Sequence, residues 1–192
     1  MMAKREEIRL CGYGGQGIIL AGHIIGQAAS IFEHKYATYI RDYGPEARGG
    51  TCRADLVISD EEVVYPYIRA PSVLVAMSQQ AYDKYHIENN EDALVIIDDG
   101  LVKPVPNKQR VLAIPARRIA EELGRVMVAN IVMLGFLTAV TDIATADSMK
   151  KSLMATVPKG TEELNMEAFE RGYAYGLKKA GRDRHFPNGE SG

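Results

Sequence analysis

The sequence predicts an α/β fold in which a mostly parallel sheet is covered by helices on both faces. The first observation is that short apolar runs, such as Val73–Ala76 and Val111–Ile114, alternate with segments of helical periodicity. The second is a glycine-rich turn that joins a short predicted strand, with Ile8, Leu10 and Cys11, to the first helical segment. The third is the partly alternating run Thr51–Ser59, followed by a polar turn into Val63–Tyr65, which predicts one antiparallel hairpin. Together these patterns indicate a Rossmann-like, doubly wound sheet.

The remaining elements follow from local patterns. Apolar residues recur with helical spacing from Ile18 to Phe32, and the next strand-like run is Tyr36–Ile40. A helix capped by Ser78 should end near Asn89, and a strand is expected at Ala93–Ile97. Further helices are expected from Pro115 to Gly124 and, as an apolar helix, at 126–140. The last two helices should be capped by Thr145 and Asn165.

Length and composition are those of an ordinary globular protein. At 192 residues the chain suits one domain, which we expect over residues 1–180, with a polar and flexible tail at 181–192. A net charge of −2 provides no strongly basic surface for nucleic acid. The N-terminus does not resemble a leader, and the longest apolar run, 126–140, is short for a membrane span. We therefore expect a cytoplasmic protein that binds neither nucleic acid nor membranes.

Cysteine and histidine usage predicts no metal site in this chain. The two cysteines are Cys11 and Cys52, and the four histidines have no metal-binding spacing. A four-iron cluster or a structural zinc site usually needs about four ligands. Both cysteines fall in predicted strands, where a reduced thiol packs as a small apolar residue. No nucleophile–base pair or paired carboxylates stand out, so we also predict no catalytic residue.

The first glycine-rich stretch is the turn after the first strand. Gly12, Gly14 and Gly17 have the G-x-G-x-x-G spacing that can hold a dinucleotide pyrophosphate at a helix N-terminus, and Gly15 and Gln16 lie between them. The acidic residue expected at the end of the second strand would be Asp42, which comes late. The alternative is that the glycines let the helix pack closely on its strand.

The second stretch runs from Tyr43 to Gly50, after the second predicted strand. It contains the functional candidates Tyr43, Gly44, Pro45, Glu46, Arg48, Gly49 and Gly50. Loops that leave the carboxyl ends of parallel strands line one edge of the sheet, so we expect both stretches to meet at one rim. Glu46 and Arg48 could offer a carboxylate and a guanidinium to a partner. The alternative is a solvated loop in which these two side chains pair with each other.

In these motifs the sequence resembles the gamma subunit of 2-oxoacid:ferredoxin oxidoreductases. The resemblance rests on Gly12-Tyr13-Gly14-Gly15-Gln16-Gly17 and on Tyr43-Gly44-Pro45-Glu46-Ala47-Arg48-Gly49-Gly50. It continues through Ile114-Pro115-Ala116, Ala129-Asn130, Met133-Leu134-Gly135, Asn165, Ala168-Phe169 and Gly172, and so spans nearly the whole chain.

The resemblance implies a component of an enzyme that converts a 2-oxoacid and coenzyme A to an acyl-CoA and carbon dioxide while reducing ferredoxin. Thiamine diphosphate with Mg²⁺ and [4Fe-4S] clusters would lie on other subunits, and this chain would bind none of them alone. The implied partners are the alpha and beta subunits, with a ferredoxin-like delta subunit as a further candidate, and ferredoxin as electron acceptor. The resemblance leaves the substrate open among pyruvate, 2-oxoglutarate, branched-chain 2-oxoacids such as ketoisovalerate, and indolepyruvate, and the short single-domain form without a ferredoxin segment favours the 2-oxoglutarate type.

These implications assign roles to individual residues. The first loop would be approached closely by a ligand or by another backbone, and the sequence does not identify which; its residues are Gly12, Gly14, Gly15, Gln16 and Gly17. The 43–50 stretch would dock on the thiamine-binding subunit. Asn130, a polar residue in an apolar helix, would either bond to nearby backbone or support the glycine loop from below. The competing hypotheses are a free-standing Rossmann-type nucleotide-binding oxidoreductase and a structural homomer.

Overall fold

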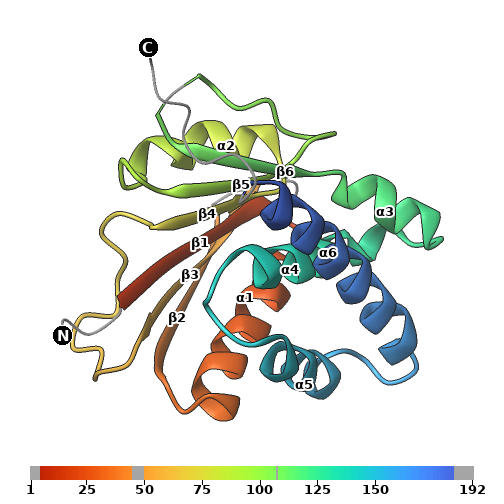
Figure 1. Ribbon diagram of the computed structural model, residues 1–192. Coiled ribbons are helices and arrows are strands. Elements are labelled where there is room, and N and C mark those ends of the chain that lie inside the picture. The colour runs from red at the N-terminus through yellow and green to blue at the C-terminus, as the bar shows by residue number, and fades with distance from the viewer. Residues whose placement is uncertain (1–4, 45–49, 107, 184–192) are drawn as a thin grey trace.

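The computed structural model describes residues 5–44, 50–106 and 108–183. A six-stranded sheet of order β2-β3-β1-β4-β5-β6 forms its centre (Figure 1). The strands are β1 (Arg5–Tyr13), β2 (Tyr36–Tyr43), β3 (Thr51–Ser59), β4 (Val73–Ala76), β5 (Leu94–Asp98) and β6 (Arg110–Ile114). β1, β4, β5 and β6 pair in parallel, whereas β3 is antiparallel to both β2 and β1. The predicted fold class is thus confirmed.

The antiparallel hairpin lies elsewhere than the sequence suggested. It joins β2 to β3, in a register that pairs Tyr36 with Ser59 and Tyr43 with Cys52. Val63–Tyr65 forms no strand. The physical reason is that both edges of β3 are already occupied, one by β2 and the other by β1, so the segment that follows β3 has no edge to pair with.

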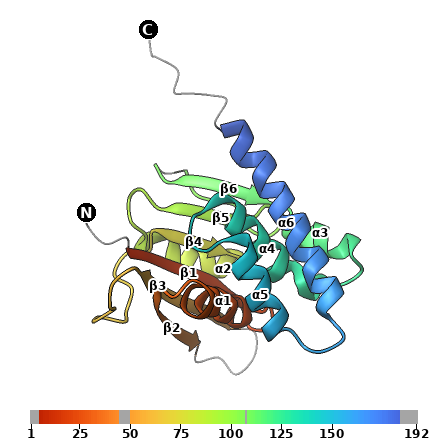
Figure 2. The same cartoon turned by 60° about the horizontal axis from the view of Figure 1, so that its bottom comes forward.

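Helices cover the sheet unequally. α1 (Ile18–Gln27), its π-helical continuation η1 (Ala28–Phe32), α4 (Ala129–Val140), α5 (Ala146–Thr156) and α6 (Glu162–Asp183) gather on one face, where the larger hydrophobic core lies (Figure 2). α2 (Gln79–Tyr85) and η2 (His86–Glu88) cover the other face over a smaller core. α3 (Ala116–Glu122) and η3 (Val126–Val128) lie between β6 and α4. In the described part of the chain no helix is both long and apolar enough to cross a membrane.

The start of the last helix corrects a prediction, whereas the two earlier caps are confirmed. Ser78 accepts a hydrogen bond from the Ala81 N–H, and Thr145 accepts one from the Ser148 N–H. Asn165 is not an N-cap, because α6 already begins at Glu162 and the Asn165 side-chain amide donates back to the Thr161 carbonyl at 2.8 Å. α6 continues to Asp183, so residues 181–183 of the expected tail are helical.

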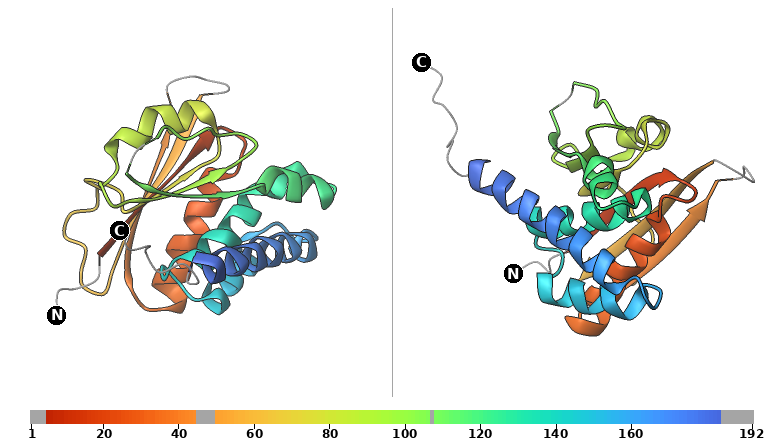
Figure 3. Two further views of the ribbon diagram at one scale, coloured as in Figure 1. Left: turned by 45° about the horizontal axis from the view of Figure 1, so that its top comes forward. Right: turned by 90° about the vertical axis from the view of Figure 1, so that its right-hand side faces the viewer.

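α4 and α6 cross in close contact through glycines (Figure 3). A Cβ at Gly172 would lie 1.9 Å from the Val132 carbonyl oxygen, and one at Gly135 would lie 2.0 Å from that of Phe169. The two backbones therefore touch at these points without side chains between them. This contact fixes α4, whose first residues lie beneath the glycine-rich turn.

A charged cluster is buried between the sheet and α2. The Arg9 guanidinium donates two hydrogen bonds to the Asp55 carboxylate, at 2.8 and 2.9 Å, and also contacts Glu88. It lies 5.0 Å from the centre of the Tyr85 ring. Burial alone would lower the pKa of Arg9, but the two carboxylates raise it above its usual value. Arg9 is therefore a permanently charged structural element, and its bidentate pair with Asp55 offsets part of the desolvation penalty of burying the charge.

Candidate functional site: the glycine-rich rim

The glycine-rich turn lies where β1 ends and α1 begins. Gly15 and Gly17 have φ angles of 95° and 73°, a conformation that residues with a Cβ rarely adopt. The Gly14 N–H donates to the Gly50 carbonyl at 3.1 Å. The described ends of the two predicted stretches thus meet at the same edge of the sheet, as the sequence predicted.

Gln16 joins the two strands that flank this edge. Its side-chain oxygen accepts a hydrogen bond from the Tyr13 N–H at 2.7 Å, and its side-chain nitrogen donates to the Met77 carbonyl at 2.8 Å. A Cβ at Gly12 would lie 2.5 Å from that oxygen, so Gly12 makes room for the Gln16 amide. The oxygen and the nitrogen of the Gln16 side-chain amide therefore both form hydrogen bonds within the protein, and they link the end of β1 to the end of β4.

Asn130 supports the turn from below. This residue is buried, and its side-chain amide donates to the Gly17 carbonyl at 3.1 Å. A Cβ at Gly17 would lie 2.2 Å from the same amide nitrogen, so no larger residue fits between the turn and α4. The two interpretations of Asn130 describe one interaction, because the backbone that satisfies the amide is that of the glycine-rich turn.

The second stretch lies at the same rim only in part of its length. Tyr43 ends β2 with its side chain 62% exposed, and the Gly44 N–H donates to the Thr51 carbonyl at 3.0 Å. The candidates Pro45, Glu46, Arg48 and Gly49 lie outside the described residues, so their roles remain predictions.

A small hollow opens beside the turn. It has a volume of about 100 Å³ and is lined by Gly15, Gln16, Met77, Leu101, Arg117, Val126, Met127 and Ala129. β1 and β4 are adjacent parallel strands whose following helices pack on opposite faces, and the hollow lies at their carboxyl ends. Ligands and partners of open α/β sheets bind at such switch points. Met127, at the start of the nearly uniformly apolar segment 126–140, is 72% exposed there.

Asp98, the last residue of β5, has a structural role. The Asp98 carboxylate is fully buried, and it accepts hydrogen bonds from the Gly100 N–H at 2.9 Å and the Arg117 N–H at 2.7 Å. Burial raises the pKa of Asp98, although both hydrogen bonds oppose the shift. Asp98 thereby fixes the start of α3 and, with it, the position of Arg117 at the hollow.

The two cysteines pack in the core of the sheet. Cys11 and Cys52 are both buried and unpaired, and burial raises the pKa of each thiol. Among the described residues no group of three or more histidine, cysteine or acidic side chains is arranged to hold a metal ion. Two protonated core thiols do not match the four thiolate ligands of a [4Fe-4S] cluster.

Fold and rim together define a Rossmann-like α/β domain with a glycine-rich turn at the switch point of its sheet. The family model described as pyruvate ferredoxin/flavodoxin oxidoreductase matches residues 7–175, and the chain belongs to this family. Over 173 residues it is 50% identical to the 2-oxoglutarate synthase subunit KorC of Methanocaldococcus jannaschii, covering 88% of this chain and 92% of that protein.

Solved structures agree with this assignment. The gamma subunit of a keto/oxoacid ferredoxin oxidoreductase from Geobacter sulfurreducens PCA has a TM-score of 0.81 and 37% identity, covering 90% of this chain and 99% of that one. The 2-oxoglutarate:ferredoxin oxidoreductase from Magnetococcus marinus, with 2-oxoglutarate, coenzyme A and succinyl-CoA bound, has a TM-score of 0.83 and 24% identity, covering 91% of this chain and 31% of that one. The latter likeness shows the shared fold. The chain is thus a gamma-type subunit of a multi-subunit 2-oxoacid:ferredoxin oxidoreductase.

Proposed function

We propose that this chain is the gamma subunit of a 2-oxoglutarate:ferredoxin oxidoreductase and that its glycine-rich rim docks on the subunits that bind thiamine diphosphate. The observation that carries the proposal is the Gly14–Gly50 hydrogen bond, which unites both glycine stretches at the switch point of the sheet. Exposed apolar side chains, Tyr43 and Met127, lie at the same edge. Apolar and aromatic side chains around bare backbone are suited to protein contact.

The complete enzyme would convert 2-oxoglutarate, coenzyme A and oxidised ferredoxin to succinyl-CoA, carbon dioxide and reduced ferredoxin. Thiamine diphosphate with Mg²⁺ would supply the carbanion chemistry, and [4Fe-4S] clusters would carry the electrons. The two buried thiols do not fit a [4Fe-4S] cluster, and the described residues include no group of three or more acidic, histidine or cysteine side chains placed to hold a metal ion. We therefore assign the cofactors to the alpha, beta and ferredoxin-like delta subunits, in the cytoplasm. The 50% identity to a 2-oxoglutarate synthase subunit supports this substrate.

The size of the hollow weighs against a free-standing dinucleotide enzyme. Sites for drug-sized ligands usually enclose roughly 300–1,000 Å³, whereas the hollow beside Gly15 has about 100 Å³. The Gln16 amide also spans the gap between the ends of β1 and β4, and its hydrogen-bonding groups are already satisfied. The rim accommodates a partner side chain or one small group, in keeping with docking.

Co-expression with the remaining subunits tests the proposal. We expect the double variant Tyr43→Ser, Met127→Ser to assemble at least about tenfold more weakly in sedimentation experiments, because central apolar contacts dominate interface energies. The control is Leu177→Ser, which removes a comparably exposed apolar side chain from α6. The assembled enzyme should reduce viologen with coenzyme A and 2-oxoglutarate far faster than with pyruvate or branched-chain 2-oxoacids.

Two results would contradict this proposal. The first is unchanged assembly of the rim variant. The second is tight binding of NAD(P) or flavin to the isolated chain, which would support the competing nucleotide-binding enzyme. A preference for pyruvate would correct the substrate alone and leave the docking role intact.

A further inference from the structure

Residues 60–72, here called the 60–72 loop, connect β3 to β4 without helix or strand. The loop starts beyond Ser59, which pairs with Arg5 at the first residue of β1. It therefore lies at the end of the strands opposite the glycine-rich rim, at a distance of about 27 Å for nine residues of strand. Long irregular loops in compact domains usually have a function.

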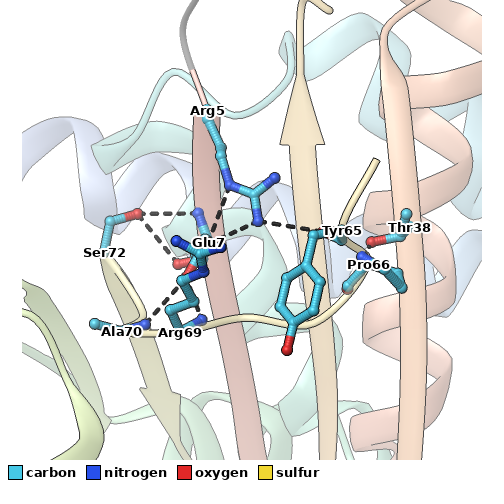
Figure 4. A network of polar contacts seen from close by, with 8 residues as sticks. All are labelled: Arg5, Glu7, Thr38, Tyr65, Pro66, Arg69, Ala70 and Ser72. Carbon is cyan, nitrogen blue, oxygen red and sulfur yellow. Dashed lines mark hydrogen bonds and ion pairs between the residues drawn. The ribbon is translucent and has the colours of Figure 1, made fainter. Parts of the chain in front are cut away.

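The Glu7 carboxylate holds one end of the loop in place (Figure 4). One of its oxygens accepts hydrogen bonds from the backbone N–H groups of Arg69, at 2.7 Å, and Ala70, at 3.1 Å. The other oxygen is bound by the Arg5 guanidinium at 2.9 Å, which also reaches the Tyr65 carbonyl at 3.4 Å. A single carboxylate thus orders two separate parts of the loop.

Two further contacts fix the loop to the sheet. The Thr38 hydroxyl of β2 donates to the Pro66 carbonyl at 3.1 Å, and the Ser72 N–H donates to the Glu7 carbonyl at 2.8 Å (Figure 4). The loop is therefore ordered in advance of any partner. Such ordering lowers the entropic cost of binding.

The ordered loop exposes apolar and aromatic side chains to solvent. Val64 is 91% exposed and Tyr67 57% exposed, and the Tyr65 ring lies 5.6 Å from that of Tyr67. The Arg69 guanidinium stacks over the Tyr65 ring at 5.3 Å. Tyrosine and arginine are the residue types that most often carry the binding energy of protein interfaces.

The positive charge of Arg69 in the 60–72 loop has no carboxylate partner among the described residues. Within the described part of the chain the Arg69 guanidinium forms no ion pair, and its contact is the Tyr65 ring. Beside it lies an open hollow of about 420 Å³, lined by Arg5, Glu7, Glu62, Val64, Tyr65 and Arg69. A carboxylate placed in this hollow would form a charge-assisted, bidentate pair with Arg69.

We propose that the 60–72 loop is a second docking surface, which binds another subunit of the oxidoreductase through a carboxylate set among apolar side chains. The proposal rests on membership of a multi-subunit enzyme and not on the role of the glycine-rich rim. With both surfaces occupied, this chain bridges two neighbours at opposite ends of its β1 strand.

A second copy of this chain fits the surface poorly. The 60–72 loop begins with three exposed acidic residues, Asp60, Glu61 and Glu62. Two loops facing each other would bring six such carboxylates against two unpaired guanidiniums, those of Arg69, whereas a single partner carboxylate beside Arg69 adds one negative charge and pairs it. Like charges at an interface oppose association, so a different subunit is the expected partner.

The test uses the full chain and the complete set of subunits. We expect the double variant Val64→Ser, Arg69→Glu to keep the urea midpoint of the wild type, because both side chains are exposed. Its affinity for the remaining subunits should fall at least about tenfold. The matched control is Leu177→Ser, Lys178→Glu, which makes the same types of change on α6 and should bind as the wild type does.

Hydroxyl-radical footprinting of the native complex gives an independent reading. The peptide that carries Tyr65 and Tyr67 should be oxidised several-fold more slowly in the complex than in the isolated chain. Equal oxidation in both, or unchanged affinity of the double variant, would overturn the proposal. Concentration-dependent dimerisation of the isolated chain that the double variant abolishes would also overturn it, in favour of a second copy. If the rim variants bind the remaining subunits weakly while the loop variant binds them as the wild type does, the rim is a docking surface and the proposal for the 60–72 loop is refuted.

Discussion

The crossing of α4 and α6 offers a sharp test of how tightly this fold is specified. At Gly172 an added Cβ would lie 1.9 Å from the Val132 carbonyl oxygen, whereas carbon–oxygen contacts are normally about 3.3 Å or longer. Because the atom it meets is backbone, the two helices must move apart. Such overpacking costs about 1–3 kcal/mol or more, and the better helix propensity of alanine returns up to about 1 kcal/mol.

We therefore expect Gly172→Ala to lower the free energy of unfolding by about 2 kcal/mol, which for a chain of this size corresponds to a fall in Tm of about 4–8 °C. Urea denaturation and differential scanning calorimetry measure both quantities. The control, Gly181→Ala, lies in the same helix with no atom within 4 Å of the added Cβ, and it should stabilise slightly. Equal stabilisation by both substitutions would refute the close approach of the helices.

Three further predictions concern buried polar contacts. Asn130→Ala removes the hydrogen bond to Gly17 and should cost about 1 kcal/mol in urea denaturation while also weakening assembly; unchanged assembly would mean that the rim does not depend on this support. Asp55→Asn leaves Arg9 with Glu88 as its remaining carboxylate and should cost about 3 kcal/mol in guanidinium denaturation, a loss that the double variant Arg9→Met, Asp55→Leu should largely recover. Burial alone would raise the pKa of Glu33, but hydrogen bonds from the start of α5 and a lysine lower it below its usual value. This carboxylate therefore stabilises the fold at pH above about 4.5, and the contribution is lost as the pH falls through its folded-state pKa. Urea midpoints measured from pH 3 to 7 should fall less steeply on acidification for Glu33→Gln than for the wild type, and parallel curves would contradict the assignment.

Local signals in the sequence predicted much of the fold. β4 occupies Val73–Ala76 as expected, and the caps Ser78 and Thr145 mark their helices, because a side chain that accepts a backbone N–H acts within one turn. The hairpin at Val63–Tyr65 was wrong because strand pairing depends on which edges are free, a long-range property. The cap at Asn165 was wrong because the helix starts at Glu162, one turn earlier.

The candidate site was predicted in outline but not in detail. The positions of both stretches directly after predicted strands were sufficient to place them at one rim, since β1 and β2 run in the same direction on either side of β3 and their carboxyl ends lie at the same edge of the sheet. The apolar run 126–140 did not show that Met127 lies at the surface, because a pattern of apolar residues does not indicate which of them are exposed. The role of Gln16 was also missed, since its partner, the Met77 carbonyl, comes from a strand far along the chain.

The amide of Gln16 has a consequence for how this fold came to serve in an assembly. In many doubly wound proteins the seam between the two central strands stays open and admits a nucleotide. Here one side chain bridges that seam from Tyr13 to Met77, and the edge becomes a rigid platform. A platform that does not reorganise on contact loses little freedom when a neighbour settles on it. A turn braced in this way is suited to the docking role proposed above.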